Sequence, residues 1–114
     1  DKGRADLQAW LDVPFTEQEV KKDTLLLKIF FASPNNKAAI LTQLRLQLTL
    51  HRQKLAEYRS ETPEAIVKML SQQPELVQNA LLWEATRRYG EMYEETYMRW
   101  LEDTIQQMEN LLPD

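Results

Sequence analysis

The chain has 114 residues, of which 43% are hydrophobic and 28% charged, and its formal net charge is −4. A polypeptide of this size and composition is expected to fold as one soluble domain rather than to remain disordered. It contains no cysteine, which excludes disulfides, zinc–thiolate sites and a thiol nucleophile, and which agrees with a reducing cytoplasmic location. Only two glycines interrupt a sequence rich in helix-forming residues, so we expect an all-α fold.

The charge is unevenly distributed along the chain. Residues 1–60 hold ten Lys and Arg against seven Asp and Glu, giving +3, whereas residues 61–114 hold four against eleven, giving −7. No basic stripe for nucleic-acid phosphates results, so this chain by itself is not expected to bind DNA. No run of roughly 20 apolar residues occurs either, so we expect no membrane-spanning segment and no membrane partner.

Two helices are expected in the N-terminal third. Leu7, Trp10 and Leu11 follow each other at steps of three and one, the spacing of a short amphipathic helix that ends before Pro14. A Thr16–Glu19 capping box then predicts a helix from about Glu17 to Phe31. The apolar residues of its second half, "LLLKIFF", cover about 240° of the helix circumference, against roughly 100° in a surface helix. This helix should therefore pack on more than one side.

A long helix is predicted from about Lys37 to Arg59, because leucines recur on it as a heptad seam in which His51 occupies the one gap. His51 is interpreted as a polar residue that sets the helix register, with pH sensing as the alternative. A short helix follows, from Pro63 to near Gln73.

The last helix is predicted to run from Pro74 to Leu112, with only Gly90 to interrupt it. Its predicted seam consists of Leu82, Thr86, Tyr89, Tyr93, Trp100, Leu101, Ile105, Met108 and Leu111. Unbroken, such a helix would span about 57 Å at ~1.5 Å per residue, against a diameter of about 35 Å for a compact domain of this length. Either Gly90 breaks the helix or a second chain covers its seam. We expect the second: an extended homodimer with two long, coiled-coil-like helices.

The sequence offers little for catalysis. One histidine without cysteine cannot complete a metal-ligand set, and Gly3 and Gly90 are too far apart for a phosphate-binding loop. We therefore expect no enzyme activity, no metal and no cofactor. The acidic residues of the last helix are interpreted as a solvated face paired with nearby arginines; they are Glu84, Glu91, Glu94, Glu95, Glu102 and Glu109.

The aromatic residues of the last helix allow two interpretations. Aromatic side chains at helical spacing usually serve packing, in a core or a dimer seam. The alternative is a pocket for a flat aromatic ligand, with tyrosine hydroxyls as polar contacts. The candidate ligand-binding residues are Trp83, Tyr89, Tyr93, Tyr97 and Trp100.

The order of these features resembles a known family. The chain has, in order, Leu7, Trp10-Leu11 and Pro14, then "KDTLLLKIFF", a leucine-rich helix and a final helix with Trp100-Leu101. This order resembles the C-terminal region of PadR-family transcriptional regulators. The resemblance is to the larger subclass that includes the virulence activator AphA. Two departures are Lys22-Asp23-Thr24, where the family often has Arg-Asp-Glu, and Tyr89, which separates Arg88 from Gly90.

This resemblance implies an organisation and a function. Residues 1–13 would be the tail of a preceding winged-helix domain, and residues 14–114 a C-terminal helical dimerisation and effector domain. DNA would be bound only through the winged helix, and a small aromatic compound would be the effector. The interface candidates are Leu41, Leu44, Leu48, Leu55, Tyr93, Trp100, Leu101 and Met108. A helical scaffold or adaptor unrelated to DNA is the alternative.

Overall fold

The computed structural model describes residues 1–19 and 21–114. The described residues form helices and no strand, so the predicted all-α fold is confirmed. The α-helices are α1 (Lys2–Asp12), α2 (Thr24–Phe31), α3 (Lys37–Arg59), α4 (Glu61–Gln72) and α5 (Val77–Leu111). Single 3₁₀ turns, Pro34–Asn36 and Pro74–Leu76, precede α3 and α5.

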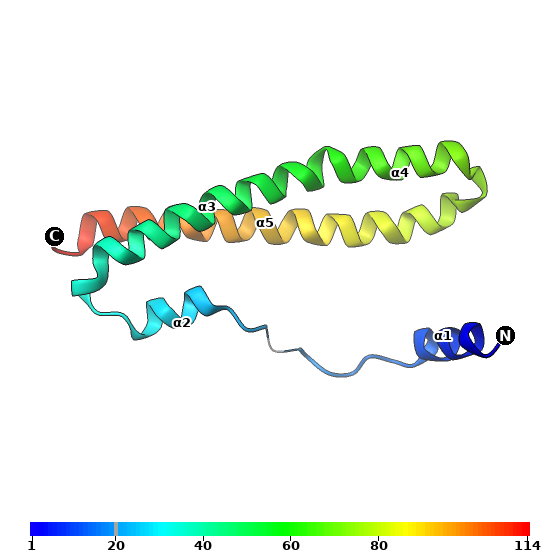
Figure 1. Ribbon diagram of the computed structural model, residues 1–114, viewed down its shortest axis with the longest axis horizontal. Helices are drawn as coiled ribbons and strands as arrows, with labels where there is room; N and C mark the ends of the chain where they lie inside the picture. Colours follow the sequence, from blue (N-terminus) through cyan, green and yellow to red (C-terminus); the bar gives the residue numbers. More distant parts are fainter. Residues whose placement is uncertain (20) are drawn as a thin grey trace.

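The molecule is a long helical hairpin (Figure 1). Helices α3 and α4 follow each other almost in line and form one arm, and α5 returns beside them as the other arm. Ion pairs join the arms across this register, for example Arg59 Nε to Glu91 Oε2 at 3.1 Å. The extents are 62 × 32 × 17 Å and the radius of gyration is 20.0 Å, whereas a compact domain of about 100 residues has a radius near 13 Å. The predicted extended shape is confirmed.

The core lies where α2, α3 and α5 meet. Leu44 of α3 and Leu101 of α5 are completely buried, and Leu25 is the buried residue of α2. Ile40 and Leu48 complete this cluster. Because a buried leucine contributes roughly 1.5–3 kcal/mol by leaving water, these few side chains account for much of what holds the arms together.

Gly90 does not break α5. The helix runs without interruption over 35 residues, and Gly90 is buried under the ring of Tyr58 from α3. A Cβ at this position would lie 2.4 Å from the ring atom Cζ of Tyr58. The glycine therefore permits a close approach of the two arms, and the alternative of a helix broken at Gly90 is wrong.

The N-terminal half of the predicted α5 seam lies on the surface of a single chain, and its coverage by a second chain stays a prediction. Leu82 and Tyr89 are 69% and 68% exposed, whereas Gly90 and Glu94 on the adjacent stripe are buried. The large apolar side chains lie outside because the inner stripe packs against residues that α3 supplies. Glu94, predicted on a solvated face, instead contacts His51 in the interior.

Helix α2 is shorter than predicted. It begins at Thr24 rather than near Glu17, with Asp23 as its N-cap, and residues 17–19 are not helical; Val20 lies outside the described residues. The polar stretch before Asp23 has no apolar face to bury, so a capping sequence alone does not start a helix there. Phe30 and Phe31 are 79% and 78% exposed, so within one chain α2 packs on one side only.

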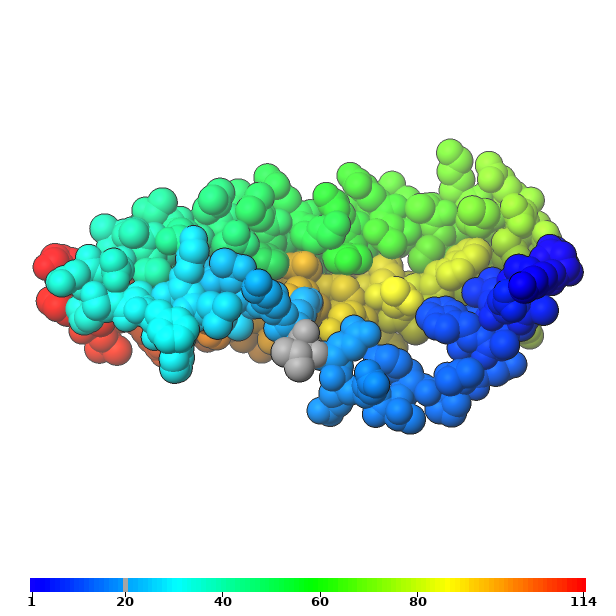
Figure 2. All heavy atoms as spheres, turned by 60° about the horizontal axis from the view of Figure 1, so that its bottom comes forward, coloured from blue at the N-terminus to red at the C-terminus, as the bar shows by residue number. Residues whose placement is uncertain are grey.

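Helix α1 forms as predicted but buries no residue. Both views place it toward the end of the hairpin where α4 turns into α5, while α2 lies along the α3–α5 half (Figures 1 and 2). Figure 2 shows residues 13–19, which follow α1, standing away from the hairpin with an open gap beside them. The N-terminal part thus adds apolar surface rather than covering it.

Candidate functional site

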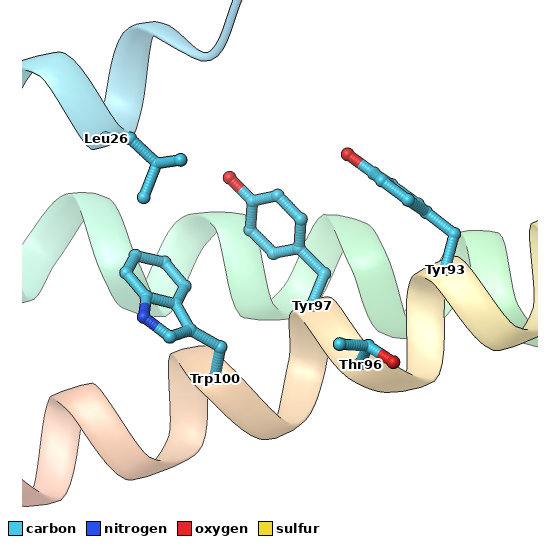
Figure 3. A pocket seen from close by; sticks show the side chains of 5 residues that line it. All are labelled: Leu26, Tyr93, Thr96, Tyr97 and Trp100. Atoms are coloured by element: carbon cyan, nitrogen blue, oxygen red, sulfur yellow. The ribbon is translucent and has the colours of Figure 1, made fainter. Parts of the chain in front are cut away.

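A cavity of about 310 Å³ lies between α2 and α5. Leu26 of α2 forms one wall, and Tyr93, Thr96, Tyr97 and Trp100 of α5 form the other (Figure 3). Ligand pockets are typically about 300–1,000 Å³ and mostly apolar with a few polar groups. The space is therefore sufficient for one small, flat molecule.

The rings on α5 form a row along one face of the helix. Centroid distances are 6.3 Å for Tyr89–Tyr93, 5.9 Å for Tyr93–Tyr97 and 5.8 Å for Tyr97–Trp100, the last pair at 86°. Steps of four, four and three residues keep them on neighbouring turns. Aromatic rings attract each other edge to face as well as stacked, so this row offers both modes of contact to an aromatic ligand.

Asp23 joins α2 to this row. The hydroxyl of Tyr97 donates to Asp23 Oδ2 at 2.7 Å, while Oδ1 of the same carboxylate accepts the backbone N–H of Leu26 at 3.1 Å. Partial burial raises the pKa of Asp23, but the hydrogen bonds from Tyr97 and the α2 backbone outweigh burial and hold the pKa of this carboxyl below its usual value. Burial and the Asp23 contact together raise the pKa of the Tyr97 hydroxyl, so Tyr97 is the donor at neutral pH.

His51 supports Tyr97 from the opposite arm. The two rings stack at 4.0 Å with 15° between their planes, and His51 Nδ1 contacts Glu94 Oε2. Glu94 is only 6% exposed. Two polar contacts, Tyr97–Asp23 and His51–Glu94, and the stacked rings of Tyr97 and His51 therefore link α2, α5 and α3 beside the cavity.

A cation lies at the edge of the site. The ammonium group of Lys21 sits 3.6 Å from the ring centroid of Tyr93. The neighbouring Tyr93 side chain raises the pKa of Lys21, so the group is charged at neutral pH and its contact with the ring is a cation–π interaction. The cavity thus has a cationic and an anionic group, Lys21 and Asp23, near its α2 side.

The described part of the chain contains no cluster of three or more His, Cys, Asp or Glu residues placed to hold a metal ion. Within that same part, no helix is long and apolar enough to cross a membrane. The groups at the cavity are aromatic rings and hydroxyls, with the Asp23 carboxylate and the Lys21 ammonium beside them.

The chain matches the model of a known protein family. The family described as "Virulence activator alpha C-term" matches residues 21–109, more than three quarters of the chain. The chain belongs to this family. It is a helical domain of the regulator type. No curated protein and no solved structure gives a significant match to the chain.

The match to the virulence activator C-terminal family covers all five cavity residues and the Asp23 contact. Helix α1 and residues 13–19 precede the matched range. The candidate site therefore belongs to the part of the chain that defines the family.

Three of the five predicted ligand-binding residues line the cavity: Tyr93, Tyr97 and Trp100. Tyr89 stacks on Tyr93 but lies outside the cavity, and Trp83 is half-buried nearer the start of α5 and is not part of the lining. The sequence interpretation missed Leu26 and Thr96 as wall residues, together with the Asp23 contact. Thr96 could have been found, because it shares a helix face with Tyr93 and Trp100; Leu26 could not, because only the packing of α2 brings it there.

Most of the predicted interface residues are buried within one chain: Leu41, Leu44, Leu48, Leu55 and Leu101. In this arrangement Leu44 and Leu101 are fully enclosed by α2, α3 and α5, so they form the core of the hairpin and present no surface to a second copy. Tyr93, Trp100 and Met108 are half-buried. The buried leucines are thus occupied within one chain, whereas Tyr93, Trp100 and Met108 remain interface candidates, and dimerisation itself stays a prediction.

Proposed function

We propose that this chain is the dimerisation and effector-binding domain of a cytoplasmic, PadR-like transcriptional regulator. In this proposal it acts as a binding domain rather than an enzyme, and a winged-helix domain preceding residue 14 contacts DNA. The family match and the resemblance of residues 7–31 to PadR regulators support it. The net charge of −7 in the second half of the chain agrees with DNA contacts lying elsewhere.

The observation that carries the proposal is the apolar surface that one chain leaves uncovered. On α1, Trp10 is 72% exposed, and on α5, Leu81 and Leu82 are 71% and 69% exposed. Further large apolar side chains exposed on α1, α2, α5 and the α1–α2 connection are Leu7, Leu11, Phe15, Leu27, Phe30, Phe31, Tyr89 and Met92. Large apolar side chains gathered on an exposed helix face mark interaction sites.

A second copy of the same chain would cover this surface efficiently. Helix α1 carries an apolar stripe that buries nothing in its own chain, and α5 carries a second stripe beside the core-facing one. A two-fold dimer buries the same patch twice, so both stripes can be covered in both copies. A stable interface buries about 800 Å² per partner. An aromatic side chain such as Trp10 can bury about 150–250 Å², so a few of them would supply a large share of that area.

Sedimentation equilibrium tests the dimer. The purified chain should sediment at twice its 13.5 kDa mass at micromolar concentration. Trp10→Ser and Leu82→Ser should each weaken association about tenfold or more, the effect of losing roughly 1.4 kcal/mol of interface free energy. Val67→Ser is the matched control, because Val67 is 67% exposed on α4, which carries neither stripe. A single 13.5 kDa species would refute the dimer and favour a helical adaptor.

Effector binding and DNA binding need separate tests. Trp100 lines the cavity, so titration with 4-hydroxycinnamate should change tryptophan fluorescence in the wild type and not in Trp100→Phe. No change up to millimolar concentration would remove the effector role. The DNA-binding role requires a winged helix encoded immediately upstream of Asp1, and an upstream sequence without one would refute it.

A further inference from the structure

Helix α2 is held to the hairpin by few contacts. Leu25 is the one buried residue of the helix. Ile29, and Ala32 just after the helix, pack half-buried against the same core. The polar ties are the Tyr97–Asp23 hydrogen bond and a long contact of 3.4 Å between Lys28 Nζ and Gln43 Oε1. Segments with few buried apolar contacts open at low free-energy cost. The position of α2 therefore depends strongly on the Tyr97–Asp23 contact.

We propose that the Tyr97–Asp23 hydrogen bond is a latch that holds α2 over the aromatic cavity. A flat aromatic ligand carrying a hydrogen-bond acceptor competes with Asp23 for the Tyr97 hydroxyl and releases α2. A flat aromatic ligand without an acceptor fills the cavity with the latch closed. The competition between ligand and latch rests on the effector-binding role proposed above, whereas the latch itself does not.

The latch is connected directly to the cavity wall. Asp23 accepts the Tyr97 hydroxyl with Oδ2 and the N–H of Leu26 with Oδ1. The side chain of Leu26 is the α2 wall of the cavity (Figure 3). One carboxylate thus caps α2, ties it to α5 and positions the wall residue, so Asp23 cannot leave Tyr97 without disturbing Leu26.

The Tyr97 ring cannot evade the competition by turning. His51 stacks on it at 4.0 Å, and Trp100 lies edge-on at 5.8 Å. The hydroxyl of a tyrosine has one proton to donate. A ligand group that accepts the hydrogen bond of this hydroxyl therefore replaces Asp23 as the acceptor. The orientation of the ring keeps the hydroxyl at the cavity.

Charge near the latch favours an acceptor that is anionic. A carboxylate ligand would repel Asp23, and the Lys21 ammonium at the Tyr93 ring is placed to balance the ligand's charge. His51 and Glu94, which face Tyr97 from its other side, contact each other.

Distance measurement between two spin labels tests the latch. Because the chain has no cysteine, Phe30→Cys on α2 and Asn110→Cys on α5, both exposed, can be labelled specifically. The latched pair should give one narrow distance distribution. Tyr97→Phe removes only the hydroxyl and should raise the released fraction about tenfold, as expected for losing one hydrogen bond to a charged group. The matched control is Tyr89→Phe, which removes a hydroxyl outside the cavity and should leave the distribution unchanged.

Equal distributions in the wild type and in Tyr97→Phe would overturn the latch. Two probes then test the competition: 4-hydroxycinnamate should broaden the wild-type distribution, and indole, which lacks an acceptor, should narrow it. Binding of 4-hydroxycinnamate that narrows the distribution would overturn the competition. Failure of both probes to bind at millimolar concentration would instead refute the proposed effector role and with it the competition, while the Tyr97→Phe comparison still decides the latch.

Discussion

Truncation of Leu101 tests whether the leucine seam holds one chain together or joins two. Leu101 is fully buried between the arms in a single chain. Leu101→Ala removes about three methylene equivalents, worth roughly 0.8 kcal/mol each, or about 2.4 kcal/mol in transfer free energy. The cavity left behind adds about 1 kcal/mol, because a hairpin of this kind relaxes only partly around it. We expect the free energy of unfolding to fall by about 3–4 kcal/mol.

Urea unfolding followed by far-UV circular dichroism measures this loss. The decrease should be the same at low and high protein concentration, since the contacts of Leu101 lie within the chain. Leu111→Ala, on the same helix but with Leu111 78% exposed, is the control and should change the free energy of unfolding by less than about 0.5 kcal/mol. A Leu101→Ala protein that loses less than about 1 kcal/mol, or whose loss appears only as weaker dimerisation, would refute our assignment of Leu101 to the core.

Three further perturbations address single contacts. Folding lowers the pKa of Asp23, so the carboxylate contributes stability above its usual pKa of 3.8, and this contribution is lost as the pH falls through the folded-state pKa. Urea midpoints should therefore drop more steeply below pH 3.8 in the wild type than in Asp23→Asn. Glu94→Ala removes the partner of His51 in the interior and should lower the free energy of unfolding by about 1–3 kcal/mol in the same assay. Gly90→Leu forces a side chain against Tyr58 and should cost about 1–3 kcal/mol, measured by thermal unfolding.

Matched variants separate these effects from general damage. Asp6→Asn on α1, far from Tyr97 in the chain, should follow the wild-type pH profile, and a shared change would contradict the role of Asp23. Glu102→Ala is the exposed counterpart of Glu94→Ala, and similar losses in both would argue against an interior contact. Ala85→Leu lies on the exposed side of α5; if Gly90→Leu were no worse, the close approach of Tyr58 would be refuted.

The sequence by itself determined the helices whose signals are local. The leucine repeat predicted α3 over Lys37–Arg59, the bounds that it has, and the proline-marked breaks predicted α1 and the turn before α5. These features depend on side-chain spacing and backbone restrictions within one or two turns, so they need no knowledge of partners. The tyrosine and tryptophan spacing offered a pocket only as the alternative to packing, and three of its residues, Tyr93, Tyr97 and Trp100, line the cavity because one helix face carries them.

Only the tertiary structure decided what each face packs against. A heptad repeat states that a stripe is buried but not whether its own chain or another covers it, so Leu44 and Leu101 could not be assigned from spacing. Gly90 and Glu94 occupy the inner stripe only because Tyr58 and His51 meet them there from α3. The Tyr97–Asp23 contact joins residues 74 positions apart. Such pairings depend on the antiparallel register of two long helices, which no local pattern encodes.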